Sequence, residues 1–126
     1  MATVLVVDDD SDIRRVLRRL LEHAGHRVTE ADSADHAMEE VLATPAPDAV
    51  VCDVVMPEKS GLGFYSDVMA RAPHMRRRVV FLTGAASDRA VHDRIEQLGV
   101  PLLGKLGDLQ LVVDAVRVAL LRPNLS

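Results

Sequence analysis

Residues 3–17 read TVLVVDDDSDIRRVL, a stretch in which a strand pattern ends in a row of acids. The apolar run at residues 4–7 is rich in β-branched side chains and is typical of a buried strand. Asp8, Asp9 and Asp10 follow it without a spacer. One or two acids would serve a helix start, which favours negative charge. Three adjacent carboxylates repel one another, so this run indicates that the folded protein binds a cation at the end of the strand.

The rest of the chain alternates between strand patterns and helix patterns. Ser11 is the expected cap of a first helix, whose apolar stripe begins at Ile13 and which Gly25 ends. Further strands are predicted at residues 27–31, 49–52, 79–82 and near 102–103, with further helices after Ser33, near 62–70, from Ser87 and over about 108–121. This alternation predicts an α/β fold in which helices cover both faces of a parallel sheet.

The length and composition fit one domain. The chain has 126 residues, of which 48% are hydrophobic, enough for a sizeable core. Its net charge of −4 argues against a general nucleic-acid binder. The single Cys52 excludes an internal disulfide, and the sequence has neither a membrane-span run nor a signal-peptide pattern. We therefore expect a cytoplasmic protein with no membrane and no nucleic-acid partner, a single domain over residues 1–126 with no output domain.

The chemically capable residues follow the predicted strands. Four strands are followed directly by such residues: Asp8 and Asp9, then Asp53, then Thr83 with Gly84, and finally Lys105. Because the carboxyl ends of parallel strands meet at one edge of a sheet, where open α/β folds bind ligands, these residues are expected to form one site. The second strand also ends in an acid, Asp32, but this strand is less apolar and is expected at a lateral edge, away from the others.

These residue types suit phosphoryl transfer. Converging carboxylates provide the oxygen ligands that Mg²⁺ binds together with waters and a phosphate oxygen. A lysine and a threonine hydroxyl can contact phosphoryl oxygens, and a carboxylate can act as the nucleophile. Asp53 is the best candidate for the nucleophile because it stands alone after a central strand and faces the other groups.

Four stretches, VLVVDDDSDIRRVL, VVCDVVMPEKSGL, VVFLTG and LLGK, together resemble the receiver domains of two-component response regulators, the CheY-like superfamily. The resemblance extends from Val4 to about Leu120. It implies a doubly wound, flavodoxin-like (βα)5 sandwich of three layers with strand order 2-1-3-4-5. The VVFLTG and GVPLLGK stretches look most like receivers that are attached to, or serve, hybrid histidine kinases.

The resemblance also implies roles for the acidic residues. Asp53 would accept a phosphoryl group from a phosphohistidine donor, either a histidine kinase or a histidine phosphotransfer protein. Asp8, Asp9 and Asp53 would hold Mg²⁺ together with the backbone carbonyl of Val55. Asp10, with Asp12, is then left for the start of the helix. Such a domain is a signalling switch and catalyses only its own phosphorylation and dephosphorylation.

The remaining site residues include departures from the family pattern. By the resemblance, Thr83, Gly84 and Lys105 would bind the phosphoryl group. Leu102 stands at the switch position, where the family often has an aromatic residue. Leu106 replaces the proline that usually follows the lysine, and a trans bond is expected there because a non-proline cis bond costs roughly 2.5–4 kcal/mol.

Val55 is a further departure, two residues after Asp53. Its side chain cannot orient an attacking water, so a long-lived phosphoryl group is predicted. A phosphohydrolase with an aspartate nucleophile usually has a second aspartate at this position. Because Val55 stands there instead, a phosphohydrolase function is ranked low. The main alternative is a degenerate receiver that acts as a phosphorylation-independent interaction module, and metal and phosphodonor binding would separate the two.

The chain offers three candidate surfaces for contacts with partners. Few polar residues interrupt the last helical pattern, which predicts either an unusually buried helix or a partner surface on its flank. In receivers the face made by the fourth helix, fifth strand and fifth helix commonly serves as an interface, so the resemblance implies that an effector or a second copy binds there. Arg14 and Arg15 lie beside the predicted site and could meet a docking phosphodonor. The run at residues 76–78 is interpreted as a solvated face. The histidines show no ligand spacing, and none is interpreted as a phosphodonor.

Overall fold

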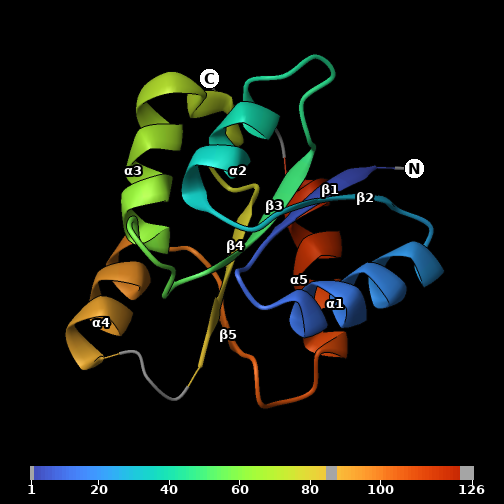
Figure 1. The fold of residues 1–126 in the computed structure, drawn as a ribbon. Helices are drawn as coiled ribbons and strands as arrows, with labels where there is room; N and C mark the ends of the chain where they lie inside the picture. The colour runs from blue at the N-terminus through green and yellow to red at the C-terminus, as the bar shows by residue number, and fades with distance from the viewer. Residues whose placement is uncertain (1, 85–87, 123–126) are drawn as a thin grey trace.

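The computed structural model describes residues 2–84 and 88–122. Its elements, in chain order, are β1 (Thr3–Val7), α1 (Ser11–His23), β2 (Arg27–Ala31), α2 (Ala34–Val41), β3 (Ala49–Asp53), α3 (Gly61–Arg71), the 3₁₀ turn η1 (Pro73–Met75), β4 (Val79–Thr83), α4 (Arg89–Leu98), β5 (Leu102–Gly104) and α5 (Gln110–Leu121). The five strands form one parallel sheet in the order β2-β1-β3-β4-β5 (Figure 1). The α/β fold and its strand order are therefore as predicted.

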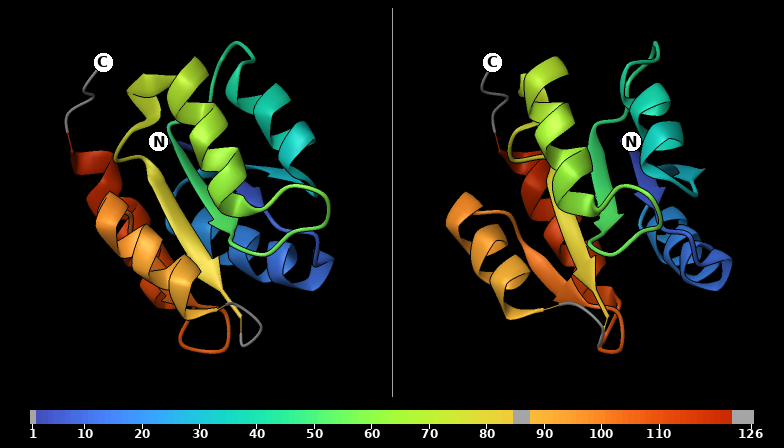
Figure 2. Two further views of the ribbon diagram at one scale, coloured as in Figure 1. Left: turned by 90° about the vertical axis from the view of Figure 1, so that its left-hand side faces the viewer. Right: turned by 60° about the vertical axis from the view of Figure 1, so that its left-hand side comes forward.

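The helices cover both faces of this sheet. Alternate strand residues face opposite ways, so Leu5 packs with α2, α3 and α4, whereas Val4 packs with α1 and α5. Figure 2 shows α2, α3 and α4 in front of the sheet with α1 and α5 behind it. Because both faces are covered, the central strands are apolar and buried from Val4 to Val7 in β1 and from Ala49 to Cys52 in β3.

Local chemistry sets the turn from β1 into α1. Asp10, rather than the predicted Ser11, caps the helix, and its side chain accepts hydrogen bonds from the backbone N–H groups of Asp12 and Ile13. Ser11 is already the first helical residue. Gly25 follows the end of α1 with a φ of +97°, a conformation that favours glycine. The expected use of Asp10 and Asp12 at the helix start is confirmed.

The other helix ends agree closely with the sequence patterns. Ser33 caps α2 by accepting a hydrogen bond from the backbone of His36, and Gly99 ends α4 in the left-handed region. Asp88 is the cap of α4, whereas the predicted start at Ser87 lies outside the described residues. In the part of the chain that the structure describes, no helix has the length and apolar character needed to cross a membrane.

Glu30 on β2 ties α1 to the sheet. It accepts hydrogen bonds from Arg14 at 2.9 Å and from Arg18 at 2.6 Å. Arg14 also donates to the backbone carbonyl of Asp8 at 2.7 Å, so it is engaged within the fold instead of being available for docking. Arg15, whose side chain is 69% exposed, is still accessible to a docking protein.

We expect a pH-dependent stability contribution from this cluster. Burial alone would raise the pKa of Glu30, but the hydrogen bonds from Arg18 and Arg14 outweigh it, so the pKa lies below its ordinary value of 4.5. The contribution is therefore present above pH 4.5 and is lost as the pH falls through the lowered pKa. Glu30→Gln should cost about 1 kcal/mol at neutral pH and nothing in strong acid, as measured by urea denaturation.

Glu39→Gln is the matched control, since Glu39 is exposed on α2 and makes no ion pair within the described residues. It should leave the free energy of unfolding unchanged at both pH values. Equal effects of the two substitutions at neutral pH would show that the Glu30 cluster contributes nothing specific.

Candidate functional site

The carboxyl ends of β1 and β3 lie side by side at the point where the strand order reverses. Val7 pairs with Cys52, so Asp8 and Asp53 leave the sheet at the same level. Both carboxylates are buried, with Asp8 0% and Asp53 3% exposed, and they are the buried charged residues in the described part of the chain. Burial of two acids in contact is costly unless a cation faces them.

Lys105, directly after β5, supplies that positive charge. Its Nζ lies 2.8 Å from Oδ2 of Asp8 and donates a hydrogen bond to Oδ2 of Asp53 at 2.9 Å. The side chain is only 16% exposed. Its backbone N–H donates to the carbonyl of Thr83 at 2.9 Å, so the start of the β5–α5 loop is anchored to the end of β4. The predicted site is therefore assembled from three separate strand ends.

Backbone groups orient both carboxylates. The N–H of Asp10 donates to Oδ1 of Asp8 at 2.9 Å, and the N–H of Val55 donates to Oδ1 of Asp53 at 3.3 Å. In each case the residue two positions later holds the carboxylate, which leaves Oδ2 of both acids turned toward Lys105.

Burial and ion pairing have opposite effects on the pKa values at this site. It raises the pKa of Asp8 above its ordinary value, against the opposing effect of Lys105. Burial alone would lower the pKa of Lys105, but the adjacent Asp8 and Asp53 outweigh it and raise that pKa. Lys105 therefore stays positively charged at neutral pH. Burial also raises the pKa of the Cys52 thiol well above its usual range, so Cys52 is a neutral packing residue, as expected from the sequence.

Asp8, Asp9 and Asp53 fit a divalent cation. One carboxylate oxygen from each residue lies within 4.8 Å of the others. Among the described residues no donor makes a hydrogen bond of normal geometry to the buried Oδ2 of Asp8, which meets Lys105 only as an ion pair. Asp9 is exposed and adds a carboxylate on the solvent side. A hard cation with oxygen ligands, such as Mg²⁺, matches this set of donors.

Thr83 and Gly84 lie at the end of β4, as predicted. A Cβ placed on Gly84 would lie 4.0 Å from Cδ of Lys105, so this glycine runs beside the lysine stem. The Thr83 hydroxyl donates to the carbonyl of Gly84 at 3.2 Å and lies 3.1 Å from Nε2 of His92 on α4. His92 is a site neighbour that sequence reasoning missed, because the histidine pattern along the chain gave no sign of a contact across the β4–α4 loop.

The two family departures near Lys105 have simple structural outcomes. Among the described residues the cis peptide bond is at Thr44–Pro45, so the Lys105–Leu106 bond is trans, as predicted. Leu106 is 86% exposed, and this bond still lets the lysine reach both carboxylates. Leu102 is partly buried against the core beneath α4 and lines a cavity together with His92.

Gly61, at the start of α3, approaches the backbone of Asp53 closely. A Cβ there would overlap the carbonyl oxygen of Asp53 and lie 2.9 Å from Cα of Val54. Backbone atoms of a central strand cannot move aside cheaply, so Gly61→Ala should lower the free energy of unfolding by about 2 kcal/mol. Chemical denaturation measures this loss directly.

Gly63→Ala is the control within the same helix. A Cβ at Gly63 would meet Cγ of Lys59, a flexible side chain, at 3.0 Å. Alanine is also the better helix former by about 1 kcal/mol, so this variant should be as stable as the parent or slightly more so. Equal losses in both variants would mean that the close approach to Asp53 has no special cost.

Comparison with known proteins agrees with the fold. The sequence profile of the response regulator receiver domain matches residues 4–117. The response regulator receiver protein CpdR of Brucella abortus is 33% identical over 87 residues, which cover 69% of this chain and 70% of that protein. A protein-glutamate methylesterase/protein-glutamine glutaminase of Anaeromyxobacter dehalogenans is 34% identical over 124 residues, covering 92% of this chain but only 35% of that protein.

The structural comparison points the same way. The crystal structure of a response regulator receiver domain protein from Clostridium thermocellum superposes with a TM-score of 0.84 at 29% identity. The match covers 95% of this chain and 94% of that one. The chain therefore belongs to the response regulator receiver domain family, a family of signalling modules rather than conventional enzymes.

Proposed function

We propose that this chain is a phosphoacceptor switch of a two-component or phosphorelay system, with Asp53 as the residue that takes the phosphoryl group. The observation that carries this proposal is the meeting of Lys105 with the buried Asp8 and Asp53 carboxylates at 2.8 and 2.9 Å. Burying two carboxylates and an ammonium group costs free energy of folding, because all three charges lose water. Phosphoryl transfer depends on charge neutralisation and positioning, and it is a function that this arrangement of charges suits.

The transfer step follows from the chemistry of the nucleophile. A carboxylate oxygen of Asp53 forms a bond to phosphorus while the phosphorus–nitrogen bond of a phosphohistidine breaks. The electron pair of that bond leaves with the imidazole nitrogen. The hydrogen bond from the N–H of Val55 keeps the Asp53 carboxylate oriented. Lys105, already 2.9 Å from Oδ2 of Asp53, balances charge on the phosphoryl oxygens.

Asp8, Asp9 and Asp53 would hold Mg²⁺, together with the backbone carbonyl of Val55. The bound cation would neutralise charge on the phosphoryl oxygens. The need for such a cation explains the acid row after β1, since only Asp10 and Asp12 are used by the helix.

Thr83 and Gly84 would contact the phosphoryl group beside Lys105. The Thr83 hydroxyl then exchanges its present neighbours for a phosphoryl oxygen, and His92 on α4 is the side chain that senses the change. Leu102 occupies the switch position beneath α4. We therefore expect the response on the surface formed by α4, β5 and α5.

The partners we propose are a histidine kinase or a histidine phosphotransfer protein as donor, in a hybrid histidine kinase system. The stretches at residues 79–84 and 99–105 support this assignment by their resemblance to receivers of such systems. An effector or a second copy would use the α4-β5-α5 surface. Leu111 and Val118 of α5 support this, because they are 51% and 48% exposed.

The phosphoryl group on Asp53 should be long-lived. The apolar side chain of Val55 is 48% exposed beside Asp53 and offers no hydrogen bond to a water that would attack phosphorus. The half-life should exceed that of a small free acyl phosphate in the same buffer. Val55→Asn, which adds an amide able to hold water, should shorten it several-fold. An equal or shorter half-life for the parent would contradict this prediction.

The proposed function is tested by intact mass after incubation with Mg²⁺ and acetyl phosphate. The parent should gain one phosphoryl group, and the gain should disappear when EDTA removes the metal. The mass readout is needed because the chain has no tryptophan to report the change by fluorescence. A folded parent that gains nothing in the presence of Mg²⁺ would favour the alternative, an interaction module that works without phosphorylation.

A further inference from the structure

A cavity of about 410 Å³ lies at the opposite end of the sheet from Asp53. It is bounded by the amino ends of β4 and β5 and by the last residues of α4 and α5. Tyr65, Arg76, Arg77 and Arg122 supply polar side chains, and Val79 and Leu98 belong to its apolar wall. A strand of five residues separates it from the phosphoacceptor edge by about 15 Å, so it is a separate site.

No ion pair among the described residues offsets the positive charge of this cavity. In the part of the chain that the structure describes, no carboxylate forms an ion pair with Arg76, Arg77 or Arg122. This occurs in a chain with 19 acidic residues and a net charge of −4. Like charges that line one cavity repel one another, so three arginines around this space favour an anion within it.

The helix ends account for only part of this charge. The C-termini of α4, at Leu98, and of α5, at Leu121, each contribute about half a negative charge. Three arginines exceed that sum by about two positive charges. The surplus is the charge of a phosphate dianion, which arginine binds through paired hydrogen bonds.

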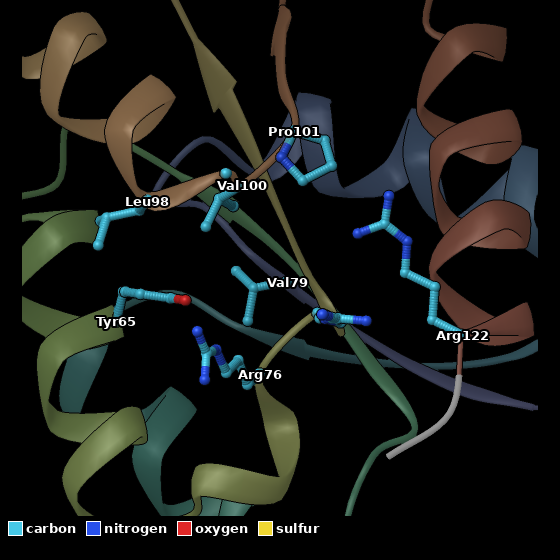
Figure 3. Close-up of a pocket in the computed structure, with 9 residues that line it drawn as sticks. Tyr65, Arg76, Val79, Leu98, Val100, Pro101 and Arg122 are labelled. Atoms are coloured by element: carbon cyan, nitrogen blue, oxygen red, sulfur yellow. The ribbon is translucent and has the colours of Figure 1, made fainter. Parts of the chain in front are cut away.

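The three arginines are exposed at the surface and line the space together with Tyr65. Figure 3 shows Tyr65 with Arg76 on one side of the cavity and Arg122 on the other, with Pro101 between them. Burial raises the pKa of Tyr65, so its hydroxyl stays a neutral donor. Arg78 donates from Nη2 to the backbone carbonyl of Arg122 at 3.1 Å, which fixes the chain where the Arg122 side chain enters.

The backbone at Arg77 points to a role for its side chain. Its φ is +77°, in the left-handed region that favours glycine. The turn here is held by the N–H of Arg78, which donates to the carbonyl of Met75 at 2.9 Å. Glycine would form this turn with less strain, so folding alone does not explain the arginine.

We infer that this cavity binds a small molecule that carries a phosphate group joined to an apolar or ring-shaped part. The arginines and the Tyr65 hydroxyl would hold the phosphate, and the wall that includes Val79 and Leu98 would cover the rest. The volume lies within the range of small-molecule sites. A nucleic acid fits less well, because it requires an extended basic stripe and the chain as a whole is acidic.

Isothermal titration calorimetry of the full chain with ADP and with pyrophosphate, in EDTA, tests this inference. The parent should bind both and should bind ADP more tightly, because only ADP reaches the apolar wall. Arg77→Gly and Arg122→Gln should each weaken binding about tenfold. Arg77→Gly should melt at or above the parent temperature, since glycine suits the turn, so its lost binding would not reflect unfolding.

The control is Arg19→Gln, which removes an exposed arginine of α1 that forms no ion pair among the described residues. It should bind like the parent, whereas an equal loss would show a general charge effect and overturn the inference. Loss of binding in Lys105→Gln, at a temperature where its melting curve shows the variant folded, would place the anion at the phosphoacceptor edge and overturn it as well. Absence of binding in the parent, or equal affinity for ADP and pyrophosphate, would overturn the proposed ligand class.

Discussion

Asp53→Asn should gain no phosphoryl group from acetyl phosphate and Mg²⁺ under conditions in which the parent is fully phosphorylated. The amide keeps the shape of the carboxylate, so the variant should remain folded, but its oxygen is a far weaker nucleophile. Intact mass gives the answer without assumptions about rate. The effect should be all or none. Among the described residues the other buried carboxylate in contact with Lys105 is that of Asp8, which in our proposal holds Mg²⁺ and therefore cannot replace Asp53 as the nucleophile.

Asp32→Asn provides the matched control. Asp32 also follows a strand, β2, but its side chain is 69% exposed and lies near His36 rather than Lys105. This variant should be phosphorylated like the parent. Phosphorylation of Asp53→Asn, or its loss in Asp32→Asn, would contradict the assignment of Asp53.

Lys105→Met should give the largest change in stability, and the change should depend on Mg²⁺. Without Lys105, two nearly inaccessible carboxylates face each other with no cation, which should cost about 3 kcal/mol in metal-free buffer. By our proposal Mg²⁺ would bind the same carboxylates, and in this variant it would no longer meet the ammonium group there. The variant should therefore gain more stability from Mg²⁺ than the parent does, by mass action on the folded state.

Urea denaturation with EDTA and with excess Mg²⁺ measures this linkage. Lys59→Met is the control, because Lys59 pairs with Asp67 on the surface of α3, and its loss should change little in either buffer. A Lys105→Met variant that is destabilised equally with and without Mg²⁺ would mean that the cation does not use these carboxylates.

The fold was predictable because its determinants are local. Residues 4–7 and 49–52 are continuous apolar runs, which is the pattern that strands of a parallel sheet with two covered faces require. The convergence of Asp8, Asp53 and Lys105 followed from strand ends alone. The cap of α1 was misassigned because Asp10 and Ser11 are both good caps. The choice depends on the backbone conformation of Asp10, which is extended in the structure.

Contacts between distant segments were not predictable in this way. The approach of His92 to Thr83 depends on where α4 packs against the sheet, and no spacing rule encodes it. The cavity around Arg77 and Arg122 joins segments that are 45 residues apart in the chain, so the sequence showed only an apparently solvated arginine run. Exposure of Leu111 likewise required the packing of α5 to be known.

Identification of the modified residue tests the central claim most directly. Borohydride reduces an aspartyl phosphate to homoserine, so the phosphorylated parent can be reduced, digested and mapped by peptide mass. We predict homoserine at residue 53, with Asp8 and Asp9 unchanged. Homoserine at another position, or phosphate that resists reduction and lies on a hydroxyl or histidine side chain, would contradict the account.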